Sequence, residues 1–375
     1  MKKVLPITLL ISIMLTACMR EGNMTTSNIS TATPSESVTT TNAPNLATTV
    51  PPDEQDPVTT PPIVTDTPPT EVVPTFDEVD WSTVDRNNRA IVYTGQTTKL
   101  YGMNGSIVAS IDAGKSLITL QRNDVYTVIL YQDALCLTYS DCLTQTEPES
   151  AKQMQDQYGG IYYPCGDILI AIDAGHQGKA MKEKEPIGPG STQMKAMVSG
   201  GTQGVSTRIA ERELNLKVAL LLRDELISRG YSVLMIRESQ DVTISNAQRA
   251  QIANAYQADA FVRIHANGST NPQVRGAMTI CQTPENPYNG SLYAESRRLS
   301  DCILENYCIA SGIVLNNVWE TDTMTGINWA ETPVTIVEMG YMSNAEEDEL
   351  MATDTFRKSA AVGIANGLDA YFTAE

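Results

Sequence analysis

Histidine and basic residues are scarce in this sequence. Only two histidines, His176 and His265, occur among 375 residues. Lysine and arginine together number 26 against 44 acidic residues, which gives a formal net charge of −18. Because nucleic acid is bound mainly through basic side chains that neutralise phosphates, this balance excludes nucleic acid as the expected partner. Any chemistry that needs imidazole depends on these two side chains.

A long apolar run is also lacking at the N-terminus, although an export signal is present. Lys2 and Lys3 precede a nearly continuous stretch of apolar or hydroxylic residues, 4–14, which is too short to span a bilayer as a helix. The segment Leu15–Cys18, with the sequence LTAC, then resembles the bacterial lipobox. This resemblance implies a lipoprotein signal peptide at 1–18 and lipid attached to Cys18. Each buried methylene of such a lipid contributes about 0.8 kcal/mol, so we expect a membrane-anchored, extracytoplasmic protein.

The remaining cysteines give no defined disulfide framework. Export makes disulfides possible. Six cysteines, however, allow 15 complete pairings, so we predict no particular pairing, and free buried thiols remain an alternative. The six are Cys136, Cys142, Cys165, Cys281, Cys302 and Cys308.

Residues 19–80 have the composition of a linker. Thr, Pro, Ser, Asn, Val and acidic residues dominate this stretch, and aromatic residues are almost absent from it. Such a composition buries too little apolar surface to offset the entropy lost on ordering. We therefore predict a disordered linker between the lipid and the folded part of the chain.

Residues 87–146 alternate short β-type runs with turn residues, which predicts a small all-β barrel. The sequences Lys99–Tyr101, Ile111–Gly114 and Tyr126–Val128 resemble a bacterial Src-homology-3-like domain. A spacer barrel without a ligand is the alternative interpretation. The expected strands cover 90–93, 98–101, 107–111, 116–120, 126–131 and 134–139.

From residue 165 to 375 the pattern changes to alternating strands and helices, after a connector at 147–166. This alternation predicts an α/β fold with an open, twisted, mostly parallel sheet flanked by helices. The expected strands are 168–173, 231–237, 259–265, 276–281 and 333–338. The expected helices are 211–229, 244–256, 293–310 and most of the last 20 residues.

Both histidines follow buried strands. His176 comes after the apolar strand that ends at Asp173, and His265 ends the strand that begins at Asp259. In open α/β sheets, ligand sites lie beyond the carboxyl ends of the strands. Two imidazoles at neighbouring strand ends can converge on one metal ion. This prediction requires the two rings to lie within about 8 Å of each other.

A carboxylate is needed to complete such a site. Glu211 and Glu213 open the helix that follows, but residues two apart on a helix point in different directions, so only one of them can be a ligand. Two histidines and one glutamate leave a tetrahedral zinc ion with one open position for water, as catalytic zinc sites require. Each glutamate is also compatible with a solvated acid in the first turn of the helix.

The motifs of residues 167–373 occur in a recognisable order. They are the His176 strand and loop, Glu211-x-x-x-Asn215-Leu216, Arg249-x-x-x-Ala253-Asn254, the strand ending in Ile264–Asn267, and Pro333–Glu346 with the sequence PVTIVEMGYMSNAE. Together they resemble the zinc-dependent N-acetylmuramoyl-L-alanine amidase family. The resemblance implies a peptidoglycan hydrolase that cleaves the amide bond between N-acetylmuramic acid and the L-Ala of the stem peptide. It also implies a location that faces the cell wall.

The resemblance further implies roles for individual residues. His176, Glu211 and His265 fall on the zinc-ligand positions, and Glu211 is preferred over Glu213 because it lies four residues before Asn215. Glu338 falls on the position of the catalytic glutamate, which would accept the proton of a zinc-activated water and deliver it to the leaving amine. The candidate substrate contacts are Asn267, Arg249 and Asn328. Asp173, Asn267 and Arg249 are candidates for orienting the ligands, and Trp329 is compatible with either substrate contact or core packing.

Two features depart from the common form of the family. Arg263 stands where a small Ser is usual, and the stretch 177–210 is a long, Gly-rich loop that can shape or gate a groove. The glycines are not followed by the Lys-Ser/Thr pair of a phosphate-binding loop, so that interpretation is disfavoured. Two other functions remain as alternatives: a different zinc-dependent wall peptidase and a catalytically silent wall-binding lipoprotein. The sequence does not indicate an oligomeric state.

Overall fold

The computed structural model describes residues 79–373. The predicted signal peptide, Cys18 and nearly all of the predicted linker lie outside the described residues. Within residues 79–373, no helix combines the length and the apolar character needed to cross a membrane.

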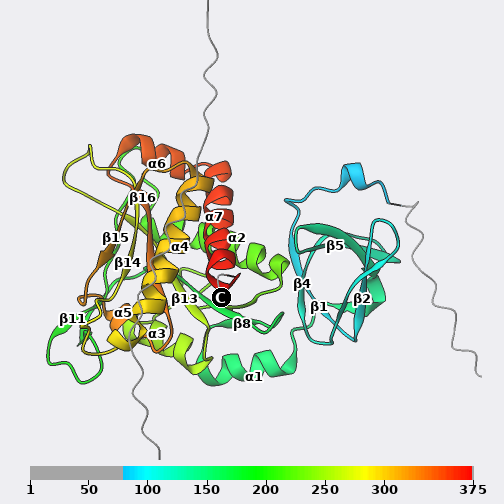
Figure 1. Ribbon diagram of the computed structural model, residues 1–375, viewed down its shortest axis with the longest axis horizontal. Helices are drawn as coiled ribbons and strands as arrows, with labels where there is room; N and C mark the ends of the chain where they lie inside the picture. The colour runs from blue at the N-terminus through cyan, green and yellow to red at the C-terminus, as the bar shows by residue number, and fades with distance from the viewer. Residues whose placement is uncertain (1–78, 374–375) are drawn as a thin grey trace, which may run out of the picture. The chain divides into compact units, whose positions relative to one another are not determined.

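A seven-stranded sheet forms the centre of the α/β region, in the order β15-β14-β16-β13-β9-β12-β8 (Figure 1). Strands β16, β13, β9 and β12 run parallel to one another, whereas β14 and β8 are antiparallel to their neighbours β16 and β12. The mostly parallel sheet predicted from the sequence is therefore confirmed. The strands are β8 (Ile161–Tyr163), β9 (Leu169–Ala174), β12 (Ser232–Met235), β13 (Ala260–Asn267), β14 (Ala277–Cys281), β15 (Leu315–Glu320) and β16 (Val334–Tyr341).

Helices cover both faces of this sheet because its central strands are apolar on both sides. Ile170 and Ile172 pack with α2 (Glu211–Arg229), α4 (Tyr293–Ser311) and α7 (Asp354–Thr373), which cluster in Figure 1. Ala171 and Leu234 pack on the other face with α3 (Asn246–Ala255) and α5 (Thr325–Asn328). The remaining helices are α1 (Glu149–Tyr158) and α6 (Ala345–Met351).

The all-β region predicted at 87–146 is a seven-stranded antiparallel sheet in the order β3-β2-β6-β5-β4-β1-β7. Fully or nearly buried side chains such as Leu100, Leu117 and Ile129 form one small core in this region. The strands are β1 (Ala90–Thr94), β2 (Thr98–Gly102), β3 (Ile107–Ile111), β4 (Ser116–Arg122), β5 (Tyr126–Tyr131), β6 (Ala134–Tyr139) and β7 (Leu143–Thr144).

Two stretches are more ordered than the sequence predicted. The connector at 147–166 contains α1 and β8, and the long loop at 177–210 contains a hairpin of β10 (Met181–Pro186) and β11 (Met194–Val198). The hairpin was missed because its strands carry exposed Lys and Glu side chains instead of an alternating apolar pattern. The six cysteines from Cys136 to Cys308 are free thiols.

Candidate metal centre

The two histidines meet because their strands are neighbours. Strand β13 pairs in parallel with β9, so the carboxyl ends of both strands lie at one edge of the sheet. His265 lies in β13, and His176 follows the end of β9 by two residues. Their ring centroids are 4.8 Å apart, with the rings nearly perpendicular at 79°. The distance required by the sequence prediction is therefore satisfied.

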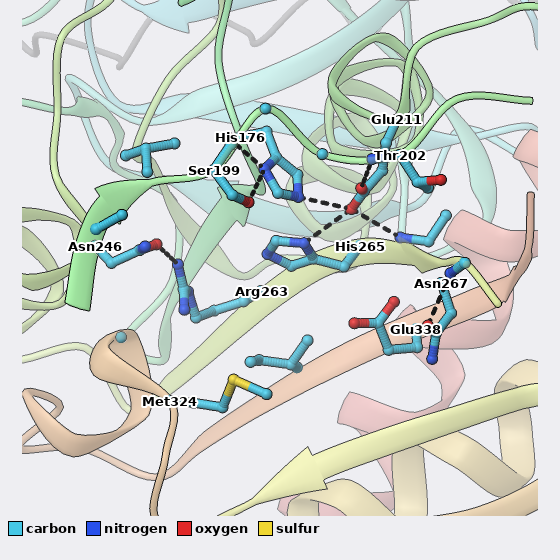
Figure 2. Close-up of a pocket in the computed structure, with 18 of the residues that line it drawn as sticks. His176, Ser199, Thr202, Glu211, Asn246, Arg263, His265, Asn267, Met324 and Glu338 are labelled. Carbon is cyan, nitrogen blue, oxygen red and sulfur yellow. Dashed lines mark hydrogen bonds and ion pairs between the residues drawn. The ribbon is translucent and has the colours of Figure 1, made fainter. Parts of the chain in front are cut away.

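Glu211, the first residue of α2, lies between the two imidazoles (Figure 2). Its Oε1 is 2.9 Å from His176 Nε2 and 3.0 Å from His265 Nδ1. Its Oε2 accepts a hydrogen bond of 2.8 Å from the Thr202 backbone N–H, which fixes the carboxylate plane. Glu213 points away, with 48% of its side chain exposed. The geometry thus places Glu211, and not Glu213, beside the histidines.

The three side chains fit a divalent metal ion. One ligand atom from each lies within 4.8 Å of the others, and two imidazole nitrogens with one carboxylate oxygen form a donor set of catalytic zinc sites. The Ser199 carbonyl lies 3.0 Å from His176 Nδ1 and accepts its proton, which leaves the Nε2 lone pair directed at the cluster. His265 Nδ1 faces the cluster at 3.0 Å from Glu211 Oε1, whereas its Nε2 is buried against the backbone at Gly175 and has no hydrogen-bond partner in residues 79–373.

Electrostatics favour the protonation states that a metal ion needs. Burial lowers the pKa of His265, which keeps its imidazole neutral. Burial alone would raise the pKa of Glu211, but hydrogen bonds with His176 and His265 outweigh it and hold that pKa below its usual range. A neutral imidazole and an ionised carboxylate are both ready to bind a cation.

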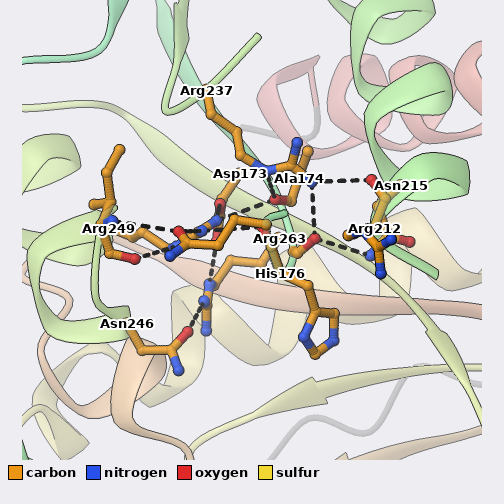
Figure 3. Close-up of polar contacts among 12 residues, drawn as sticks. Asp173, Ala174, His176, Arg212, Asn215, Arg237, Asn246, Arg249 and Arg263 are labelled. Atoms are coloured by element: carbon orange, nitrogen blue, oxygen red, sulfur yellow. Dashed lines mark hydrogen bonds and ion pairs between the residues drawn. The ribbon is translucent and has the colours of Figure 1, made fainter. Parts of the chain in front are cut away.

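Two fully buried arginines hold the loop that carries His176 (Figure 3). Arg237 donates to the carbonyl oxygens of Ala174 and Gly175 at 2.7 and 3.0 Å. Arg249 donates to the carbonyl of His176 at 3.0 Å. These bonds stabilise an unusual backbone, since His176 adopts a φ of 61°, in the left-handed region.

Gly175 lets this loop pass the second imidazole closely. A Cβ atom at this position would lie 2.2 Å from His265 Cε1 and Nε2, well inside van der Waals contact. Only glycine fits, because any side chain would displace the His265 ring. The glycine therefore sets how closely the two histidines approach each other.

Asp173 connects this support to the strand that carries His265. Its carboxylate bonds Arg249 Nη1 at 2.5 Å and Arg263 Nε at 2.9 Å, and Asp173 and Arg249 are fully buried. Burial would raise the pKa of Asp173, but the two guanidinium groups outweigh it and lower that pKa. Arg263, where a small Ser is usual in the resembling family, is thus accommodated by a buried ion pair and by the bare backbone of Gly326.

Glu338 lies opposite His265 on the neighbouring strand β16. Its Oε2 atom is buried and has no hydrogen-bond partner in residues 79–373. Burial and the nearby Glu211 carboxylate raise the pKa of Glu338 to about 8. A carboxyl group with such a pKa can take up and release a proton near neutral pH, which is what general acid–base catalysis requires.

These groups line one side of a cavity of about 730 Å³. The cavity also includes Asn267, which was predicted to contact substrate, and Lys195 and Ser199 from the long loop. In Figure 2, Arg263 and Asn246 lie at one end of the labelled group, and Glu338 and Asn267 lie at the other. One part of the cavity is therefore lined by the candidate metal ligands, and another part, called the cationic part, is lined by Arg263 and Lys195.

Two predicted substrate contacts do not line this cavity. The guanidinium of Arg249 is fully buried and committed to Asp173, to carbonyl oxygens and to Gln177 Oε1 at 2.7 Å. Asn328 is 1% exposed and donates to the Asp322 carbonyl. We assign both side chains a structural role, because neither has an atom left for substrate. Trp329 likewise donates through Nε1 to the Pro186 carbonyl, which anchors the hairpin.

Sequence reasoning missed four contributors to the site. Ser199 and Thr202 act through backbone groups, which leave no signature in the side-chain pattern. Arg237 lies two residues after the end of β12, where arginines are often exposed, and only its burial reveals its role. Lys195 could have been noted as a basic residue in an acidic chain, although its place in the cavity depends on the hairpin.

A mostly parallel α/β sheet with two histidines and two glutamates at its carboxyl edge defines a hydrolase with a candidate metal centre. The sequence profile of the N-acetylmuramoyl-L-alanine amidases matches residues 170–370, more than half of the chain, and the chain belongs to this family. It is therefore an amide hydrolase. The family, fold class and enzyme class predicted from the sequence are confirmed.

Two individual proteins and one solved structure are similar to this chain. The chain is 26% identical over 239 residues to the N-acetylmuramoyl-L-alanine amidase AmiC of Neisseria meningitidis, covering 54% of this chain and 52% of AmiC. It is also 26% identical over 238 residues to the uncharacterized protein YqiI of Bacillus subtilis, covering 64% of this chain and 93% of YqiI. The fold is shared with the amidase Ami1 of Mycobacterium smegmatis, with a TM-score of 0.51 at 24% identity over 56% of this chain and 99% of Ami1.

Proposed function

We propose that this chain cleaves the amide bond between N-acetylmuramic acid and the L-Ala of the peptidoglycan stem peptide. The observation that carries the proposal is the convergence of His176, Glu211 and His265, with Glu338 opposite His265 on the next strand. Family membership supplies the substrate class. A wall-binding protein without catalysis would not need a buried carboxylate beside a metal-type donor set.

We propose zinc as the ion, because a set of two histidines and one carboxylate with an open position is characteristic of catalytic zinc. His176, Glu211 and His265 would hold it. When bound, the ion supplies a Lewis acid that polarises the amide carbonyl and favours ionisation of water.

The side chains of the protein supply the proton transfers. Glu338 accepts the proton of the attacking water through its unpaired Oε2 atom and then delivers it to the nitrogen of the leaving L-Ala. The Ser199 carbonyl keeps the His176 proton on Nδ1, away from the reaction. The backbone around Glu211 and the two buried arginines keep the ligands fixed, so little reorganisation is needed during the reaction.

The test combines product analysis with metal analysis. We expect the wild-type chain to release peptides with a free L-Ala amine from insoluble peptidoglycan and to leave the glycan intact, as seen by mass spectrometry. Glu338→Gln should retain its zinc but lose about 10²–10⁴-fold in rate, the usual contribution of a general acid–base group. Glu331→Gln, a change of an exposed glutamate before the same strand, is the matched control.

Three results would contradict the proposal. Cleavage within the stem peptide or its cross-bridge would indicate a wall peptidase. Wall binding without any product would indicate a silent binder. Full activity of Glu338→Gln would remove this residue from the mechanism.

We also propose that the protein works at the outer face of the cell membrane as a lipoprotein. The support is the sequence of residues 1–18, with its short apolar segment and Cys18 after Leu-Thr-Ala. The test is fractionation of cells that are labelled with a fatty-acid analogue. Wild-type protein should carry label in the membrane fraction, and Cys18→Ala should lose the label and leave that fraction.

For the all-β region we propose a relation to bacterial Src-homology-3-like domains. The support is the set of sequence similarities at 99–101, 111–114 and 126–128, together with seven short antiparallel strands around one core. Cosedimentation of the Glu338→Gln chain with insoluble wall, with and without a substitution at exposed Ile107, would show whether this region adds wall affinity or acts as a spacer.

A further inference from the structure

The cationic part of the cavity has no role in the mechanism above. Arg263 precedes His265 by two residues on β13, so both side chains lie on the same face of the strand, and their Cα atoms are about 6.6 Å apart. Lys195 of the hairpin lines the same cavity and donates to the Thr323 carbonyl at 3.1 Å. Burial and the nearby Arg263 guanidinium both lower the pKa of Lys195.

Arg263 retains a donor for a ligand. Its Nε bonds Asp173 at 2.9 Å, and its Nη2 bonds Asn246 Oδ1 at 2.8 Å. No hydrogen bond from within residues 79–373 reaches Nη1, and Arg263 is one of the residues that line the cavity. Asp173 and Asn246 thus fix the orientation of the guanidinium and leave its Nη1 atom available as a donor. A planar guanidinium held in this way is suited to binding a carboxylate.

Buried charges of both signs lie behind this wall. Arg237, Arg249 and Arg263 are buried, and so are the carboxylates of Asp173, Glu185 and Glu211. Asp173 bonds Arg249 and Arg263, and Glu185 accepts the hydroxyl hydrogen of Ser245 at 2.5 Å at the start of α3. In a chain with a net charge of −18, two cationic side chains on one cavity wall are the opposite of the average surface.

We propose that Arg263 and Lys195 form a subsite for the free carboxylate of the second stem-peptide residue, counted from the cleaved amide. This inference rests on the proposed amidase function. Two residues of extended peptide span about 7 Å, which matches the separation between His265 and Arg263 along β13. A carboxylate on the α-carbon of the second residue therefore reaches the Arg263 fork while the cleaved amide lies at the histidines.

The probes are two synthetic N-acetylmuramoyl-L-alanyl-D-glutamyl peptides that continue through the γ-carboxyl group of the glutamate. In one, the α-carboxyl group is free, and in the other it is a carboxamide. Binding is measured by calorimetry with the Glu338→Gln chain, and hydrolysis is measured with the wild-type chain. We expect the free acid to bind about tenfold or more tightly than the amide, as for a charge-assisted hydrogen bond, with the effect on KM and not on kcat.

The variants assign this preference to residues. In the same Glu338→Gln background, Arg263→Met should abolish the preference, and Lys195→Met should reduce it about threefold. Lys184→Met is the matched control, because it removes the same charge from an exposed position on the same hairpin without lining the cavity, and it should keep the full preference. If Arg263→Met does not fold, as judged by circular dichroism, Lys195→Met and Lys184→Met decide the question.

The outcomes separate this inference from the proposed function. Equal binding of acid and amide, or an equal loss of preference in Lys184→Met, would overturn the carboxylate subsite and leave the amidase function standing. Failure of the wild-type chain to cleave either peptide would count against the amidase function, whereas the binding preference would still report on the subsite.

Discussion

The α/β region and the all-β region are stabilised in different ways. Between residues 90 and 144, the buried residues of the polar class are all threonines or serines, and the core consists mainly of aliphatic residues such as Leu100 and Ile118, with a few tyrosines. The α/β region instead buries full charges, including Asp173, Arg237 and Glu211. Buried ion pairs contribute little net stability compared with apolar packing of similar volume. Their concentration around the histidines indicates that they serve the geometry of the site.

Removal of the metal ion should have the largest effect. It should abolish the activity of the α/β region and leave the fold of the all-β region unchanged. Treatment with a chelator should reduce hydrolysis of peptidoglycan on the order of a thousandfold or more, and added zinc should restore it. His176→Ala should be equally inactive but should not respond to zinc, because a ligand is missing. The fold of the all-β region should be unchanged, as measured by amide hydrogen exchange of residues 90–144. Residual activity in the chelated protein would show that the site works without a metal ion.

The same ion pair, Arg with Asp, occurs buried in one region and exposed in the other. Arg249 and Asp173 are both 0% exposed, whereas Arg86 and Asp133 of the all-β region expose 47% and 93% of their side chains. Arg249→Met should lower the free energy of unfolding by about 3–5 kcal/mol, because it leaves a buried charge unpaired. Arg86→Met should cost less than about 1 kcal/mol. Urea unfolding measures both, and equal losses would refute the contrast.

Core packing should dominate in the all-β region. Leu100 is fully buried, so Leu100→Ala should cost about 2–5 kcal/mol in the free energy of unfolding of that region, from lost burial and the cavity that is left. The rate of amide hydrolysis at a temperature where the protein is still folded should stay within about twofold of wild type, since no charged group of the site is affected. A large drop in kcat would show that the two regions are functionally coupled.

Acid should lower the free energy of unfolding of the α/β region through its buried carboxylates. We expect this effect to be smaller than the three described above. The pKa of Asp173 in the folded protein lies below its unfolded value of about 3.9, so its contribution to stability is complete above that pH and is lost as the pH falls toward the folded pKa. Glu211 acts in the same direction. Asp173→Asn should be less stable at neutral pH but lose less stability between about pH 4 and 2. Identical pH slopes in urea unfolding would exclude this linkage.

The parts of this structure that could be predicted from sequence are those with strong local signals. Helix 211–229 was predicted with the observed bounds, because its apolar spacing ends at Gly230, which adopts the left-handed conformation. The convergence of His176, Glu211 and His265 also followed from strand ends and the order of motifs. The fold class of the α/β region followed from its alternating strands and helices. That of the all-β region followed from its short β-type runs separated by turn residues.

The rest depended on contacts between distant segments. The β10–β11 hairpin has little apolar alternation and is held by Glu185 at the start of α3 and by the bond from Trp329 to Pro186. Arg249 and Asn328 looked like substrate contacts because polar residues near a site usually are, yet both are buried in hydrogen-bond networks. Burial of a polar side chain is a tertiary property, and no local pattern indicates it.

The β10–β11 hairpin affects how the substrate range of this enzyme can change through mutation. The segment from Lys195 to Ser199 supplies both a cation to the groove wall and the carbonyl that sets the proton position on His176. A mutation that reshapes this segment to admit a different peptide also moves the Ser199 carbonyl. Metal affinity depends on this carbonyl, because it accepts the hydrogen bond that orients the His176 ring. Substrate range and metal retention should thus change together, and variants selected for a new stem peptide should first appear among those that bind the metal ion less tightly.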